Sequence, residues 1–268
     1  MRKLFFILLA VAATPTLFAQ QTKKDKKEEH RKRINQLIKQ EEEGVITYQK
    51  HTVFGFKLVN DGYGGFFEIG RAQSVKKALL FQLDISERTH PKEQKQSNPD
   101  YSGPRLIYGK INFFYPVKLG VQQQILLGNK SNKNGVSITA NFGGGISLGL
   151  LRPYFVDVYD TTKTPLQRKS IRYESADSNL FADNSQLYYL QATGPSFGKG
   201  WDNLKVTPGA YAKAALRFDY GKYNEVVSAI EVGMTAEYYA KKIPQLVYTD
   251  PKSLFVNLYV SIMFGKRK

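Results

Sequence analysis

The chain of 268 residues contains no cysteine and only three histidines, His30, His51 and His90. Without cysteine, disulfides, thiolate chemistry and a lipid anchor on a cysteine are all excluded. Beyond its first residues the chain also lacks any run of about 18 apolar residues, which excludes membrane-spanning helices. Any insertion into a membrane must therefore be made by strands.

Acidic residues are scarce beside basic ones, with 23 Asp and Glu against 39 Lys and Arg. At the start, Arg2 and Lys3 precede an apolar run from Leu4 to Ala13, and small residues approach Ala19, which predicts a signal peptide over residues 1–19. Its removal leaves a net charge of 37 − 23 = +14. Such a charge suits nucleic acid, but an exported chain rarely meets it, so we expect no nucleic-acid partner. Anionic lipid phosphates, or simply solvated loops, account for the cations.

Residues 20–45 form a separate, highly charged zone. Only Ile34, Leu37 and Ile38 are apolar there, and their spacing places them on one side of a helix that Gly44 would end. So narrow an apolar stripe is marginal alone. We expect either a charged tail or a helix that docks on a periplasmic partner.

From residue 46 to the end, apolar and polar residues alternate with a period of two. In the segment 136–150, for example, Val136, Ile138 and Phe142 oppose Ser137, Thr139 and Gly143. An apolar face against a small, weakly polar one suits a strand with lipid outside and a crowded lumen inside. We count eight such strands, at about residues 49–60, 63–73, 76–88, 114–126, 135–151, 206–220, 225–240 and 252–264.

Connection lengths support an all-β, eight-stranded, antiparallel up-and-down transmembrane barrel. The short links near Ser74, at 128–134 and at 221–224 would all face the periplasm, whereas the long links 89–113, 152–205 and 241–253 would all be external. The link 152–205 carries too many apolar residues to be disordered, so we expect part of it to fold, with a short helix around residues 179–190. It would form either an external cap over the barrel mouth or a surface that binds a partner or ligand. A soluble barrel of the lipocalin type, with its apolar face inward, is the competing interpretation.

An eight-stranded barrel is filled by its own side chains, so inward polar groups should pair with one another. Alternation places seven charged residues in this lumen network: Lys57, Glu68, Asp84, Lys213, Arg217, Glu231 and Glu237. It adds the polar or charged residues Gln82, Gln122, Gln124, Asp219 and Asn257. Because an unpaired buried charge is costly, we expect Lys213 and Arg217 to be matched by Glu231, Glu237 or Asp84.

Two other clusters could carry chemistry. Asp84, Glu87, His90 and Glu93 include possible metal ligands, but interleaved Arg88 and Lys92 favour a solvated strand end, so no metal and no cofactor are expected. A lipid-modifying hydrolase would need a serine, a histidine and an acid. His51 could face outward, and His90 could meet Ser97 or Ser102, but no Gly-x-Ser-x-Gly elbow lies near either histidine in the sequence. We assign no catalytic residue.

Several segments together resemble a family of uncharacterised outer-membrane β-barrel proteins of the Bacteroidota type. They are residues 60–64, 90–93, 128–135, 143–154, 208–213 and 264–268. The resemblance implies a barrel and an outer-membrane location, and it supplies no activity. The sequence thus predicts a non-enzymatic anchor or accessory subunit of an envelope complex, in contact with outer-membrane lipids and with a periplasmic or outer-membrane protein partner. The alternative is the hydrolase.

Overall fold

The computed structural model describes residues 49–74, 76–96, 104–130, 135–160, 163–173, 179, 187, 190–221 and 225–268. The chain divides into two compact units, Met1–Thr47 and Tyr48–Lys268, of which the first lies outside the described residues. The expected signal peptide and charged zone therefore remain predictions. In the described part, no helix has the length and hydropathy needed to span a membrane.

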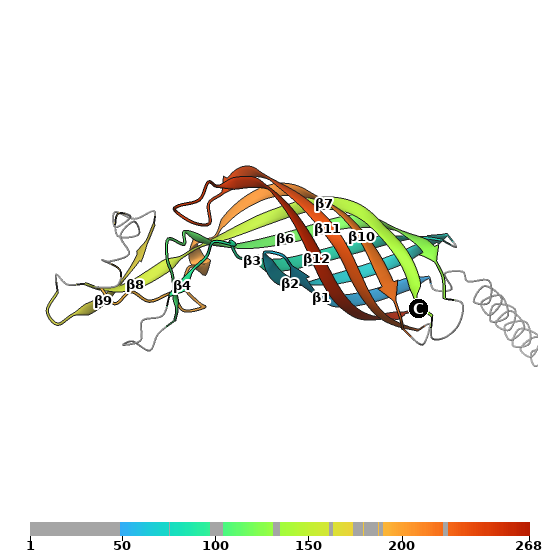
Figure 1. Ribbon diagram of the computed structural model, residues 1–268, viewed down its shortest axis with the longest axis horizontal. Coiled ribbons are helices and arrows are strands. Elements are labelled where there is room, and N and C mark those ends of the chain that lie inside the picture. Colours follow the sequence, from blue (N-terminus) through green and yellow to red (C-terminus); the bar gives the residue numbers. More distant parts are fainter. Residues whose placement is uncertain are drawn as a thin grey trace, which may run out of the picture. The chain divides into compact units, whose positions relative to one another are not determined.

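Eight long antiparallel strands close into a barrel in the order β1-β12-β11-β10-β7-β6-β3-β2 (Figure 1). Apart from the closing pair β1 and β12, each strand pairs with the long strands before and after it in the chain, so the topology is up-and-down and the prediction is confirmed. The bounds are β1 Lys50–Val59, β2 Gly62–Ser74, β3 Lys77–Arg88, β6 Asn112–Gly128, β7 Ser137–Pro153, β10 Lys205–Asp219, β11 Val226–Ile243 and β12 Lys252–Arg267.

The two ends of the barrel differ in their connections. One end, here the terminal rim, carries the start of β1, the end of β12 and the links of residues 75–76, 129–136 and 220–225. The other end, the loop rim, carries the links of residues 60–61, 89–111, 154–204 and 244–251. The short and long links thus segregate as the strand count predicts.

The described part of the longest link contains β-structure that the sequence did not predict. It begins with a β-hairpin of β8 Phe155–Asp160 and β9 Gln167–Arg172, and it holds the 3-10 turn Trp201–Asn203. Most of the expected helix at 179–190 lies outside the described residues. A second short pair, β4 Lys95–Gln96 with β5 Leu106–Ile107, lies in the link 89–111.

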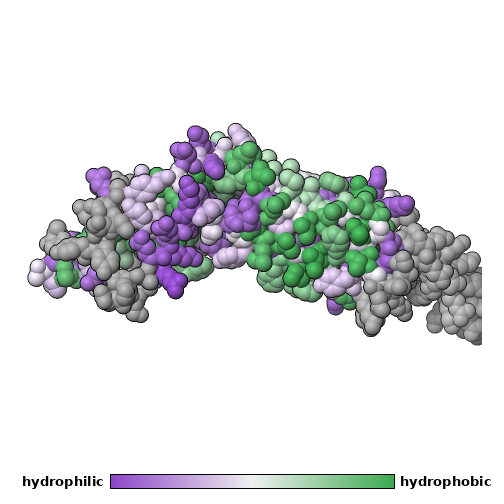
Figure 2. All heavy atoms as spheres, in the orientation of Figure 1, coloured by the Kyte–Doolittle hydropathy of each residue, from purple (hydrophilic) through white to green (hydrophobic). Residues whose placement is uncertain are grey.

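Side-chain burial along the barrel strands has the polarity of a membrane protein. In β12 every second residue from Leu254 to Phe264 is exposed and apolar, with Leu258 67% exposed, whereas Asn257, Tyr259 and Ser261 between them are buried. The same alternation holds on β1, β2 and β3. Figure 2 shows hydrophobic side chains gathered over the barrel, with hydrophilic ones toward its ends. The apolar rows face lipid, which rejects the lipocalin-type interpretation.

Glycines on the inward face make room for long lumen side chains. A Cβ on Gly70 would lie 2.0 Å from Cε1 of His51, and a Cβ on Gly120 would lie 2.4 Å from the hydroxyl oxygen of Tyr211. Both distances are far below van der Waals contact. The narrow barrel therefore places glycine opposite a large inward residue, which gives the small inward face seen in the sequence.

The links at the loop rim form a small folded body with an apolar core, here the external unit. Its buried core residues come from the β4–β5 region, the β8–β9 hairpin and the segment 187–192, namely Leu106, Ile107, Tyr154, Val156, Val158, Ile171, Leu187 and Ala192. The hydroxyl of Tyr154 accepts a hydrogen bond from the backbone N–H of Ile107 at 2.8 Å. This bond ties the link 89–111 to the link 154–204.

Candidate functional site

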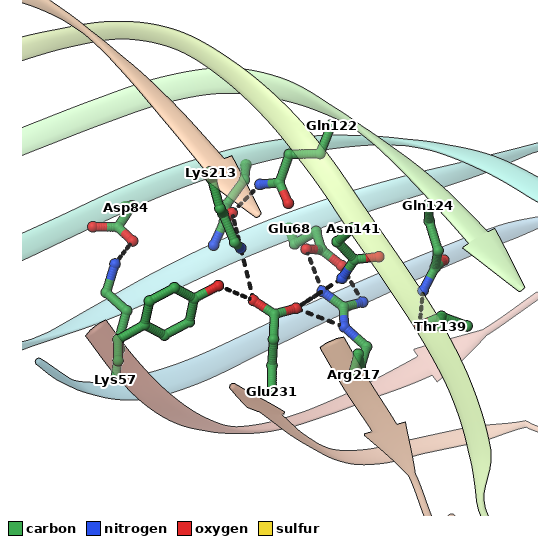
Figure 3. A network of polar contacts seen from close by, with 12 residues as sticks. Lys57, Glu68, Asp84, Gln122, Gln124, Thr139, Asn141, Lys213, Arg217 and Glu231 are labelled. Carbon is green, nitrogen blue, oxygen red and sulfur yellow. Dashed lines mark hydrogen bonds and ion pairs between the residues drawn. The ribbon is translucent and has the colours of Figure 1, made fainter. Parts of the chain in front are cut away.

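The lumen near the terminal rim is organised around one arginine. Arg217 of β10 donates two hydrogen bonds of 2.8 Å to the carboxylate of Glu68 and a third of 2.9 Å from Nε to Glu231 Oε2 (Figure 3). Nε2 of His51 lies 3.2 Å from Glu68 Oε1, and the amide of Asn141 donates to Glu231 at 2.8 Å. A fork of donors facing two carboxylates gives the geometry in which arginine pairs are strongest.

A lysine and a tyrosine extend this cluster toward the middle of the barrel. Nζ of Lys213 lies 2.7 Å from Glu231 Oε1 and donates to Gln82 Oε1 at 3.0 Å, while Gln122 donates to the same Gln82 oxygen. The hydroxyl of Tyr259 donates to Glu231 at 2.7 Å. Glu231 thus accepts from three strands around the ring and is completely buried.

A second ion-pair cluster lies nearer the loop rim. Lys57 pairs with Asp84, and Lys118 lies 3.3 Å from Asp84 and 2.9 Å from Glu237. The guanidinium of Arg88 forms ion pairs with Glu237 and with Asp61, each with an N–O distance of 2.6 Å.

The joined side chains balance in charge. Ion pairs of 3.3 Å or less within the lumen involve six cations, Lys57, Arg88, Lys118, Lys213, Arg217 and Arg267, and six carboxylates, Asp61, Glu68, Asp84, Asp219, Glu231 and Glu237. The charges of these six cations and six carboxylates cancel. Pairing offsets the large cost of removing each charge from water.

All seven charged residues that the sequence placed in the lumen network are buried there, none more than 8% exposed. Glu231 pairs with Lys213 and Arg217 as expected, but Asp84 and Glu237 pair with other cations. Arg88 and Lys118 were missed. Continuing the inward alternation from Gln82 and Asp84 to Arg88, and from Gln122 back to Lys118, would have found both.

Aromatic side chains fill the lumen at the loop rim. The rings of Phe114, Tyr239 and Phe255 contact one another, with centroids 5.4 to 5.9 Å apart. Tyr239 also donates to Glu237 at 2.9 Å, which joins the rings to the ion pairs. The lumen is therefore packed by aromatic rings at the loop rim and by paired charges between these rings and the terminal rim, as expected for a barrel of eight strands.

The structure separates the residues that a hydrolase would need. His51 does not face outward as suggested, because alternation turns Thr52 to lipid and His51 inward, where it is 3% exposed. Gly145–Gly149 matches the pattern Gly-x-Ser-x-Gly, but it lies inside β7 instead of at a strand-to-helix turn. Its Ser147 is buried, with Oγ 2.8 Å from the Tyr239 hydroxyl.

In the strand-end cluster around His90, Glu93 lies beside the histidine and accepts from its backbone N–H at 3.0 Å, whereas the other carboxylates point elsewhere. Asp84 points into the lumen, Glu87 accepts from the Tyr63 hydroxyl at 2.8 Å, and Glu93 binds Nζ of Lys110 through both oxygens at 2.8 Å. Burial lowers the pKa of Lys110, and Glu93 opposes that shift. Across the described ranges no group of three or more His, Cys, Asp or Glu could hold a metal ion. Ser97 and Ser102 lie outside the described residues.

No family model and no curated protein matches the sequence. Solved structures that align with it include outer-membrane β-barrel proteins. Neisserial surface protein A shares 8% identity over 82% of this chain and 96% of its own, with a TM-score of 0.39. The N-terminal barrel domain of Pseudomonas aeruginosa OprF shares 11% over 81% and 98%, at 0.31, and Ail of Yersinia pestis, crystallised with sucrose octasulfate, shares 9% over 81% and 97%, at 0.33. The fold assigned above rests on strand register and burial.

Proposed function

We propose that this protein is a non-enzymatic outer-membrane barrel that serves as an anchor or accessory subunit of an envelope complex. The main support is the packed, charge-balanced lumen, because a barrel filled by its own ion pairs and aromatic rings leaves a binding role to its ends. Residues 1–19 would be the export signal, and the terminal rim would face the periplasm. The motif resemblance to outer-membrane barrels of the Bacteroidota type belongs to the same proposal.

The external unit is the part that such an anchor would display. It has its own buried core, and its links begin and end on strands of the barrel. The charged zone at residues 20–45 would provide a second contact. A protein partner in the envelope could engage either one.

Conductance tests the closed lumen. The full chain, reconstituted in a planar bilayer, should give no discrete conductance steps, and Glu231→Gln should leave the bilayer equally silent because the aromatic rings still fill the loop rim. If the wild type gave conductance steps and Glu231→Gln changed their size, the lumen would be an ion path and the anchor role would be contradicted.

Affinity purification in mild detergent tests the anchor role. Three proteins would be compared: the full mature chain, the chain lacking residues 20–45, and Ile171→Ala, which removes a core side chain of the external unit. A specific envelope protein that is retained by the full chain and lost with one alteration supports the proposal. Recovery of the same proteins with all three would contradict it. His51→Ala and His90→Ala with altered envelope lipids would favour the hydrolase instead.

A further inference from the structure

Four adjacent strands carry an exposed, outward-facing cation at the terminal rim. Lys266 lies on β12, Lys50 on β1, Arg71 on β2 and Lys77 on β3, and these strands are consecutive around the barrel. We call these four residues the basic crescent. Inward-facing Arg267 is not part of it, since Arg267 pairs with Asp219 inside the lumen.

The register makes the four cations neighbours of one another. Lys50 is directly opposite Arg71. Lys266 is opposite Thr52, and Lys77 lies two residues from Leu79, the partner of Arg71, so both occupy diagonal positions. Like charges at such positions destabilise a sheet. Among the described residues no carboxylate side chain lies in an ion pair with any of the four, so their charges are left to water or to an outside anion.

Among the described residues of the terminal rim, the exposed outward-facing cations lie on the side of these four strands. At the same level, exposed apolar residues lie at or beside the ends of β6, β7, β10 and β11, namely Leu127, Val136, Tyr220 and Val226. Four exposed cations grouped on neighbouring strands could contact one anionic group together, which supports a shared binding site.

Exposed apolar side chains lie directly beyond the crescent toward the middle of the barrel. Phe54, Phe264, Ile69 and Phe81 are each 43% to 53% exposed, and the rings of Phe54 and Phe264 are 6.3 Å apart. An apolar surface that ends in a row of cations matches one class of molecule, an acyl chain that ends in an anionic headgroup.

We propose that the basic crescent binds an anionic glycerophospholipid of the leaflet around the terminal rim, with its phosphate between Lys50 and Arg71 and its acyl chains on the aromatic surface beyond. This inference rests on the membrane insertion in the proposed function and adds a lipid class to it. Each cation near an anionic surface favours binding by about fivefold.

Native mass spectrometry of lipid retained from equal mixtures of phosphatidylglycerol and phosphatidylcholine tests the proposal. The full chain should retain phosphatidylglycerol in at least about fivefold excess. A quadruple variant should retain both lipids equally; it carries Lys50→Gln, Arg71→Gln, Lys77→Gln and Lys266→Gln. A matched control with the same charge loss at the loop rim should keep the excess of phosphatidylglycerol. It carries Lys95→Gln, Lys241→Gln, Lys242→Gln and Lys252→Gln.

Three results would overturn the inference. They are equal retention by the inserted wild type, an equal loss of preference in the control, and a preference that appears only in Glu41→Gln, Glu42→Gln, Glu43→Gln. The last result would mean that Glu41, Glu42 and Glu43 of the chain itself compete with lipid for the crescent. Folding is checked by the arginine-for-lysine variant Lys50→Arg, Lys77→Arg, Lys266→Arg, which should keep the excess. Failure of every protein to insert would instead contradict the outer-membrane anchor.

Discussion

The barrel and the external unit bury opposite kinds of side chain. Inside the barrel, paired Lys, Arg, Glu and Asp residues fill the centre, and the large apolar residues point outward. In the external unit, Val156, Ile171 and Leu187 are almost completely buried. One chain therefore builds two interiors of inverse polarity.

The surrounding solvent accounts for the difference. Lipid gives no gain for burying apolar side chains, so the barrel is held by its backbone ladder and by internal polar pairs. Beyond the loop rim water returns, and burial of apolar area stabilises the external unit as it does a soluble protein. Loss of a lumen ion pair should therefore destabilise the barrel, and loss of apolar core area should destabilise the external unit.

The largest effect is expected at the centre of the lumen. Glu231→Gln should lower the free energy of unfolding by about 3 to 5 kcal/mol, because Lys213 and Arg217 lose a shared carboxylate. Urea unfolding in phospholipid vesicles, followed by electrophoretic mobility, measures this. Glu225→Gln, at an exposed position beside the start of the same strand, should change it by less than about 0.5 kcal/mol. Equal effects would mean that the lumen charges are not coupled.

The next effect is confined to the external unit. Ile171→Ala removes most of a side chain that is 1% exposed and should destabilise this unit by about 2 to 5 kcal/mol. Trypsin should then cleave sooner after Arg168 and Lys169, while the electrophoretic mobility of the folded barrel stays unchanged. Leu166→Ala, in the same hairpin but 61% exposed, is the control and should cleave like wild type. If Ile171→Ala also unfolded the barrel, the two interiors would be one cooperative unit.

The barrel strands could be predicted from sequence because the alternation of apolar and polar residues is a local pattern. A strand with lipid on one side and packed polar groups on the other alternates over its whole length, as β12 does from Leu254 to Phe264. Turn lengths then fix the number of strands. Each of the eight long strands is therefore visible without knowledge of its neighbours.

The external unit could not be predicted in the same way. Its hairpin strands are only six residues long, and β9 shows no alternation. Its core assembles Leu106, Val156, Ile171 and Leu187 from separate segments. No local pattern reveals which of these meet. Pairing within the lumen has the same limit, since alternation places Asp84 and Glu237 inward but does not say that Lys118 joins them.

A smaller effect is expected where glycine faces a lumen side chain. Gly70→Ala should cost about 1 to 3 kcal/mol in the same urea assay, because its Cβ would overlap the ring of His51. Adding His51→Ala should restore part of the loss, which gives a coupling energy by a double-mutant cycle. Gly65→Ala, whose Cβ would lie 3.5 Å from its nearest neighbour, is the control. Equal cost in both glycine variants would argue against close packing of the lumen at His51.

The smallest effect lies outside the barrel and depends on pH. Burial lowers the pKa of His90 from its ordinary value of 6.5, and Nδ1 of its neutral ring accepts a hydrogen bond from the N–H of Lys92 at 3.2 Å. This contribution is fully present above pH 6.5 and is lost as the pH falls through the lowered pKa, because protonation removes the acceptor. Exchange of the Lys92 amide, corrected for its intrinsic rate, should lose protection worth less than about 1 kcal/mol between pH 8 and pH 5. His90→Asn keeps an acceptor that does not titrate, so its protection should not change over this range. A drop of the same size in both proteins would place the titrating group elsewhere in the link, beside Glu93 and Lys110, and not at the imidazole.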